Sequence, residues 1–264
     1  MTQLNGLDLK LENAKVYFNQ KEIVIYPSIF HILKKRLKLL IYGDRDGVSS
    51  NFLQKSTNGV FLSIEQLVKF EKEFPREIID YLDKGKDLFH RVSKTQSSIT
   101  NTRWNAEEQL FILLYSLVKA NNSKLIIETG VANGITTNAI MKALEESGAE
   151  GELHSFDVLP ETNKAYLGDG NWNFHLLKGK STHNQIKSVV SSLPKVDIWV
   201  HDSNHGYRWQ KFEYLLALSV LNKNGILISD DIDASSAWGE LAKTHFRKSY
   251  VIFDSRKFIG IALK

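Results

Sequence analysis

Three aspartates and one histidine follow two apolar segments, at a spacing that could support chemistry at a metal ion. In DIWVHDSNHGYRW, Asp202 ends an apolar run and His205 follows three residues later, and in ILISDDID the next apolar run ends in Asp230 and Asp231. If both runs are adjacent parallel strands, their ends lie about 5 Å apart. Three carboxylates this close repel one another and raise one another's pKa, and a bound cation removes that cost. Oxygen ligands suit Mg²⁺ or a similar ion that keeps positions open for water and substrate.

The same residues also have a purely structural interpretation, in which Asp230 and Asp231 cap a loop and His205 lies on the surface. We favour the metal site, because a metal acidifies a bound hydroxyl and an imidazole beside it can take the proton. His201 points away from Asp202 along the strand, so we expect it to be packed or to lie beside a cofactor.

A glycine-containing turn follows another apolar run in LIIETGVANGITT, residues 125–137. Gly130 and Gly134 allow a sharp turn and a close approach of the backbone to a ligand. The helix that follows offers unpaired N–H groups at its start. The G-x-x-x-G spacing differs from the G-x-G-x-x-G of dinucleotide-binding folds. Glu128 disfavours a pyrophosphate nearby and suits a cationic ligand or one with an amino group.

The elements that must position these residues alternate between short apolar strands and helices after residue 100, which indicates a parallel sheet covered on both faces. Only four residues separate the last two strands, so they must form an antiparallel hairpin. We therefore predict an α/β fold, a doubly wound, Rossmann-like, seven-stranded sheet with a C-terminal antiparallel hairpin, preceded by a mainly helical region. Strands are expected at 125–129, 152–157, 173–178, 196–202, 225–229, 250–253 and 258–262, and helices at 105–119, 135–146, 183–192, 207–221 and 236–246.

Composition excludes several classes of protein. The 264 residues contain no Cys, which rules out disulfides, thiolate metal sites and a Cys nucleophile. The net charge of +4 is too small and too dispersed to indicate nucleic-acid binding. No apolar run approaches a membrane span and the N-terminus has no signal pattern, so we expect a cytoplasmic protein without stable membrane insertion.

The glycine turn and the residues after it resemble class I S-adenosylmethionine-dependent methyltransferases over residues 105–264. E-T-G-V-A-N-G-I-T-T is similar to the first motif of that family, Asp157 stands where the family places the acid that holds the cofactor ribose, and Gly179-Lys180-Ser181 stands where it often has Gly-Asp-Ser near the adenine. Lys180 departs from that pattern. The resemblance implies S-adenosylmethionine as cofactor. The binding residues it implies are Glu128, Gly130, Ala132, Gly134, Thr136, Thr137, Asp157, Ser181 and Asp202.

The acidic cluster resembles that of metal-dependent O-methyltransferases of the catechol and macrolide-sugar types. Asp202, Asp230 and Asp231 fall on the metal-ligand positions of these families, and His205 falls where they carry the general base. The resemblance implies a metal-assisted O-methyltransferase that uses Mg²⁺ or another divalent cation. Its methyl acceptor would be a hydroxyl of a small molecule, a sugar or a polyketide-type product.

Residues 1–100 lie outside the resemblance, and we expect a helical lid over the acceptor pocket or a contact between two copies of the chain in a homodimer. Within them, 29–41 is an amphipathic basic segment expected to dock its apolar face on its own domain or on a subunit partner. Trp104, Trp172 and Trp238 are expected near the active edge, where each could line the acceptor pocket or simply pack.

Two other functions are kept open, a nicotinamide-dependent oxidoreductase and a non-catalytic methyltransferase-like binding module.

Overall fold

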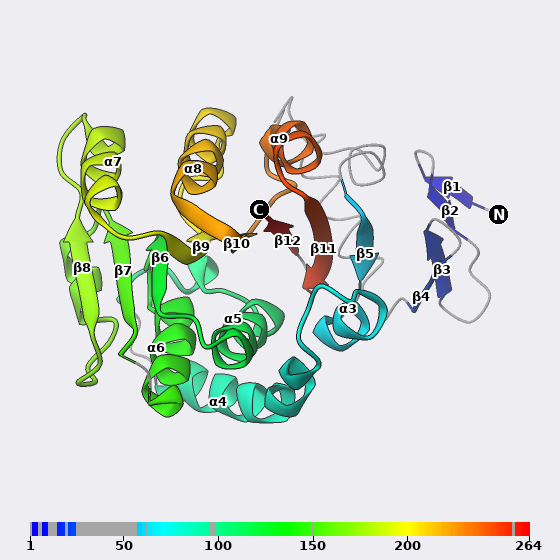
Figure 1. Cartoon of the computed structure of the whole chain (residues 1–264), viewed down its shortest axis with the longest axis horizontal. Coiled ribbons are helices and arrows are strands. Elements are labelled where there is room, and N and C mark those ends of the chain that lie inside the picture. The colour runs from blue at the N-terminus through cyan, green and yellow to red at the C-terminus, as the bar shows by residue number, and fades with distance from the viewer. Residues whose placement is uncertain are drawn as a thin grey trace.

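The structure is a computed structural model, shown in Figure 1. It describes residues 2–4, 7–9, 15–18, 21–24, 57–61, 63–95, 99–148, 150–254 and 257–264. The amphipathic segment 29–41 therefore lies outside the described residues. No helix among the residues described is long and apolar enough to span a membrane.

The predicted doubly wound sheet with its terminal hairpin is confirmed, and its strands run in the order β5-β11-β12-β10-β9-β6-β7-β8. Strands β6 to β10 are parallel to one another, and β12 is antiparallel to both β10 and β11. The seven predicted strands are β6 (Leu125–Thr129), β7 (Glu152–Asp157), β8 (Trp172–Leu176), β9 (Val196–His201), β10 (Leu221–Ser229), β11 (Lys248–Asp254) and β12 (Lys257–Leu263).

Helices cover both faces of the sheet, as Figure 1 shows. One face carries α7 (Thr182–Ser192), α8 (Tyr207–Val220) and α9 (Ala237–His245), and the other carries α3 (Ile64–Phe70), α5 (Glu108–Asn121) and α6 (Ile135–Ser147), with α4 (Leu82–Thr95) packed on α5. Three short 3₁₀ helices, η1 (Arg76–Tyr81), η2 (Thr102–Trp104) and η3 (Pro160–Lys164), lie in the connections.

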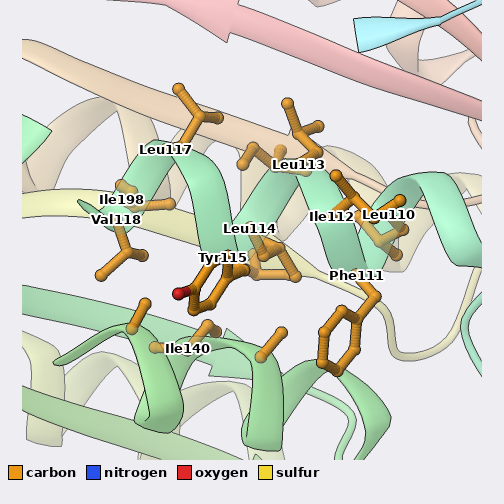
Figure 2. Close-up of a cluster of buried hydrophobic side chains, with 14 of the residues drawn as sticks. Leu110, Phe111, Ile112, Leu113, Leu114, Tyr115, Leu117, Val118, Ile140 and Ile198 are labelled. Carbon is orange, nitrogen blue, oxygen red and sulfur yellow. The ribbon is translucent and has the colours of Figure 1, made fainter. Parts of the chain in front are cut away.

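The side chains of each central strand belong alternately to two separate hydrophobic clusters, because successive side chains of a strand point to opposite faces of the sheet. Ile126 and Ile198 join the cluster under α5 and α6, whereas Ile127 and Trp199 join the cluster under α7, α8 and α9. Figure 2 shows the side chains of α5 gathered with Ile140 of α6 and Ile198 of β9. Residues 110–118 of α5 are buried on every side, which fixes this helix firmly between the sheet and its neighbours.

The N-terminal region contributes more than the predicted helices. Strand β5 (Gly59–Phe61) extends the sheet to eight strands by pairing in parallel with β11, and Leu67, Val68 and Ile78 are fully buried in the cluster under α5. Residues 57–95 therefore share a core with the sheet. Two small antiparallel pairs, β1 (Thr2–Leu4) with β2 (Leu7–Leu9) and β3 (Lys15–Phe18) with β4 (Lys21–Val24), were not predicted from the sequence.

The N-terminus of α5 is capped by a residue from the far end of the chain. No side chain of its own first turn caps it, and instead the Leu110 amide donates to Oδ2 of Asp254, the last residue of β11, at 3.0 Å. Burial raises the pKa of Asp254 to about 7, even though backbone amides donate to the carboxylate. A buried carboxyl whose pKa is raised in the folded state binds its proton more tightly there than in the unfolded chain.

This linkage predicts that stability falls as the pH rises from about 4 to about 7. Because the folded chain holds a proton that the unfolded chain has released, Asp254 lowers the free energy of unfolding by at most about 1.4 kcal/mol per pH unit in this window. Asp254→Asn keeps an acceptor for Leu110 and cannot titrate, so urea unfolding at several pH values should give a flatter profile than for the wild type. Asp169→Asn, at an exposed position, is the control. Equal slopes for wild type and Asp254→Asn would contradict this role.

Candidate active site

A cavity of about 680 Å³ lies at the carboxyl edge of the parallel strands. Ligands of doubly wound folds bind at this edge, because loops that follow the strands diverge there. The wall includes residues that follow β6, β7, β9 and β10 and one residue that opens β12. Among them are Gly130, Ala132, Asp157, Asp202, His205, Asp231 and Lys257.

The turn after β6 lies directly against the loop after β9. Gly130 has a φ of +86°, and a Cβ there would lie 2.0 Å from the backbone oxygen of Asp202. Gly134, at φ +77°, meets Ala165 in the same manner, with a Cβ-to-Cβ distance of 2.5 Å. Only glycine combines a positive φ with such close packing. The two glycines therefore let the turn reach both the cavity and the loop after β9.

Asp157, the last residue of β7, accepts hydrogen bonds from the backbone of the glycine turn. The amides of Val131 and Ala132 donate to its Oδ2 at 2.9 and 3.1 Å, and the amide of Leu159 donates to its Oδ1 at 2.9 Å. A carboxylate can accept about four hydrogen bonds. Because Asp157 also lines the cavity, it keeps acceptor capacity for a ligand.

Glu128 is placed beneath the turn and outside the cavity wall. It is fully buried, and the hydroxyls of Thr137 and Ser155 donate to its Oε2 at 2.7 and 2.6 Å. Burial raises the pKa of Glu128 to about 7 despite these donors. Gly134, Thr136, Thr137 and Ser181 also lie outside the wall, with Thr136 and Thr137 buried in α6 and Ser181 exposed at the start of α7.

The structure brings the predicted acidic cluster together. One ligand atom each from Asp202, His205 and Asp230 lies within 4.8 Å of the others. Nε2 of His205 is 4.0 Å from Oδ1 of Asp202 and 3.7 Å from Oδ2 of Asp231. Asp231 has a φ of +46°, an uncommon value for a residue other than glycine.

Lys257 completes this cluster and was missed by the sequence analysis. Its Nζ donates to Oδ2 of Asp230 at 2.6 Å and lies 3.7 Å from Oδ2 of Asp231, and its side chain is 6% exposed. An antiparallel strand begins at the edge where its parallel neighbours end. Lys257, the first residue of β12, therefore lies at the edge of the sheet that borders the cavity. The predicted antiparallel hairpin already implied this position.

The buried carboxylates of the cluster repel one another, and the positive charge of Lys257 compensates part of this repulsion. Burial, reinforced by the neighbouring charge of Asp230, raises the pKa of Asp202 well above its usual range. Burial alone would lower the pKa of Lys257, but Asp230, Asp202 and Asp231 raise it above its usual value. Burial, and then the charge of His201, lowers the pKa of His205, so its imidazole is neutral at neutral pH. The donor set fits a divalent cation, because carboxylates and an imidazole converge, although the Lys257 ammonium already supplies one positive charge beside Asp230.

A second buried polar group, also missed from the sequence, lies behind the cluster. Glu213 of α8 accepts hydrogen bonds from Thr129, Ser203 and Trp209, and its Oε2 lies 2.6 Å from Nδ1 of His201. Burial alone would raise the pKa of Glu213, but the charge of His201 and these donors lower it. His201 is fully buried, as predicted. Glu213 thus joins the end of β6 to the end of β9 and the start of α8.

The three tryptophans expected at this edge have different environments. Trp104 lines the cavity and is more than half exposed. Trp172 donates from Nε1 to the hydroxyl of Ser155, and Trp238 is fully buried, in the cluster under α7, α8 and α9. Of the three, Trp104 is therefore the one positioned to meet a ligand.

Comparison with known proteins agrees with this geometry. Residues 127–232, which include the glycine turn, Asp157 and the acidic cluster, match a family model described as a methyltransferase domain. No curated protein sequence matches the chain. Residues 127–232 are therefore similar to a methyltransferase domain, and the doubly wound sheet with its terminal hairpin agrees with that similarity.

Several solved structures are similar to this chain at low sequence identity. An O-methyltransferase from Bacillus cereus in complex with SAH has 14% identity and a TM-score of 0.47, over 76% of this chain and 97% of its own. The O-methyltransferase TomG from Streptomyces achromogenes, involved in tomaymycin synthesis and in complex with SAM, has 14% identity and a TM-score of 0.46, over 75% and 95%. The SAH-bound methyltransferase PaMTH1 from Podospora anserina has 12% identity and a TM-score of 0.47, over 72% and 89%. The SAH and SAM named here are ligands of those structures.

Removal of the Glu213 carboxylate should destabilise the protein strongly. Glu213→Ala leaves a buried imidazole, one buried donor and two half-buried donors without their acceptor, and breaking such a buried pair costs about 3–5 kcal/mol. Chemical unfolding of the purified protein measures this loss. Glu240→Ala breaks an exposed ion pair with Lys211 on the same side of the sheet and should change stability little. Equal effects of the two substitutions would show that Glu213 does not hold the strand ends together.

Proposed function

We propose that the chain is an O-methyltransferase, assisted by Mg²⁺ or another divalent cation, that methylates a hydroxyl of a small molecule, a sugar or a polyketide-type product. The observation that carries this proposal is a single cavity whose wall holds both the glycine turn and the acid–imidazole cluster. A cofactor on the turn and an acceptor at the cluster would then lie side by side.

The residues of the turn are proposed to hold S-adenosylmethionine, which supplies an electrophilic methyl group. Gly130 and Ala132 bring the backbone to the cavity wall, and Asp157 has acceptor capacity left for a ribose hydroxyl. Glu128, with Gly134, Thr136 and Thr137, is proposed to act indirectly by fixing the shape of the turn. Ser181, next to the cavity residue Thr182, is proposed to lie towards the adenine.

The cluster is proposed to bind and deprotonate the acceptor. Asp202, Asp230 and Asp231 would hold the divalent cation, which supplies positive charge beside the acceptor oxygen. Nε2 of His205 faces the carboxylates, whereas its Nδ1 is buried without a partner in the described part of the chain. Nε2 is therefore proposed to take the hydroxyl proton, and the carboxylates of Asp202 and Asp231 stabilise the resulting imidazolium.

Residues 1–100 are proposed to form a lid over the acceptor pocket or a contact in a homodimer, and residues 57–95 anchor this region through β5 and the shared core. We propose a cytoplasmic enzyme that does not bind nucleic acid.

His205→Ala should lower the rate of methyl transfer about 10²–10⁴-fold, the usual contribution of a general base, while cofactor binding is retained. Burial lowers the pKa of His205, so the wild-type rate should rise with pH through a pKa below about 6.5 and stay level above it. Transfer of a labelled methyl group to a panel of hydroxyl acceptors measures both effects, and His245→Ala, at an exposed position in α9, is the control.

The metal is tested in the same assay. Excess chelator should stop turnover and added Mg²⁺ should restore it, and Asp202→Ala should abolish both activity and metal dependence. Full activity in chelator would remove the metal from the proposal and leave His205 as the base. Full activity of His205→Ala would remove the base.

A further inference from the structure

Lys257 places a permanent cation inside the acidic cluster. Its ammonium donates to Asp230 at 2.6 Å, lies 3.7 Å from Asp231 and is almost completely shielded from solvent. A buried ammonium needs a carboxylate partner, and a group of buried carboxylates needs positive charge. Lys257 thus supplies, from within the chain, part of the charge that a metal would bring.

A divalent cation and this ammonium need the same oxygen atoms. Divalent ions bind carboxylate oxygens at about 2.0–2.6 Å. A metal on Oδ2 of Asp230 would lie only a few Å from an ammonium that stays 2.6 Å from the same atom. Two positive charges this close in a buried site repel each other strongly. The two cations therefore oppose each other at Asp230.

The side chain of Lys257 has room to withdraw. Lys257 belongs to the cavity wall, so a shift of its flexible side chain would carry Nζ into the cavity, towards the position proposed for the acceptor. Ligand atoms of Asp202 and His205 lie within 4.8 Å of a carboxylate oxygen of Asp230. Release of Asp230 would leave it free to join Asp202 as a metal ligand.

We propose that Lys257 is a built-in competitor of the divalent cation, which neutralises Asp230 when the site is without metal and must leave it when metal binds. This inference rests on the proposed metal site. It predicts weak metal binding in the wild type and a cluster that stays folded without metal. Lys257 thereby sets the metal concentration at which the enzyme becomes active.

Binding of Mn²⁺ to the full-length protein, followed by electron paramagnetic resonance, tests this without any turnover. Lys257→Gln keeps a hydrogen-bond donor to Asp230 but removes the charge, and Lys257→Met removes both. Each should bind Mn²⁺ at least about tenfold more tightly than the wild type, because one repelling charge is lost and one ligand is freed. Lys257→Arg keeps the charge and should bind as weakly as the wild type. Lys264→Met, just beyond the opposite end of β12, should leave affinity unchanged.

The outcomes separate this inference from the proposed function. If wild type and Lys257→Gln bind Mn²⁺ equally, or if the variant binds more weakly, Lys257 is not a competitor while the metal site stands. If neither the wild type nor any Lys257 variant that folds binds Mn²⁺, the metal site is wrong and the competitor role is overturned with it. Tighter binding in Lys257→Arg as well would show that charge is not the cause.

Discussion

The contact between the ends of β6 and β9 is the constraint on which the rest of the site depends. The Asp202 amide donates to the carbonyl of Thr129 at 2.9 Å, and Gly130 leaves no space for a side chain between the two backbones. Because of this contact, the glycine turn and the loop that carries Asp202 and His205 form one continuous part of the cavity wall. Glu213 reinforces it from behind by accepting hydrogen bonds from both strand ends.

Charge balance is the second requirement of this edge. Parallel strands bring Asp202, Asp230 and Asp231 together, and burial makes their mutual repulsion costly. Two basic side chains pair with carboxylates at this edge, His201 with Glu213 and Lys257 with Asp230. The side chains of the first pair are fully buried, although Glu213 forms part of the cavity wall. The second borders the cavity, where exchange for an external cation is feasible.

The sequence predicted the parts of the fold that depend on periodicity and on short connections. Strands β6 and β7 and helix α6 were located to within a residue, because long apolar patterns with clear turn signals determine them. Lys257 and Glu213 were not predicted, since Lys257 pairs with Asp230 and Glu213 with Thr129, and both partners are distant in the sequence. Glu128 was assigned to the cofactor from its motif, and that assignment stays a prediction, because the structure pairs its buried carboxylate with Thr137 and Ser155. Strand β5 was not predicted, because three residues are too few to show the alternation of apolar and polar residues that identifies a strand.

The proposed cofactor site requires that the glycine turn and Asp157 bind an S-adenosyl ligand and not a dinucleotide. Calorimetric titration of the full-length protein with S-adenosylhomocysteine and, separately, with NAD tests this most directly. We expect saturable binding of S-adenosylhomocysteine at one site per chain and no binding of NAD. Binding of NAD without binding of S-adenosylhomocysteine would contradict it.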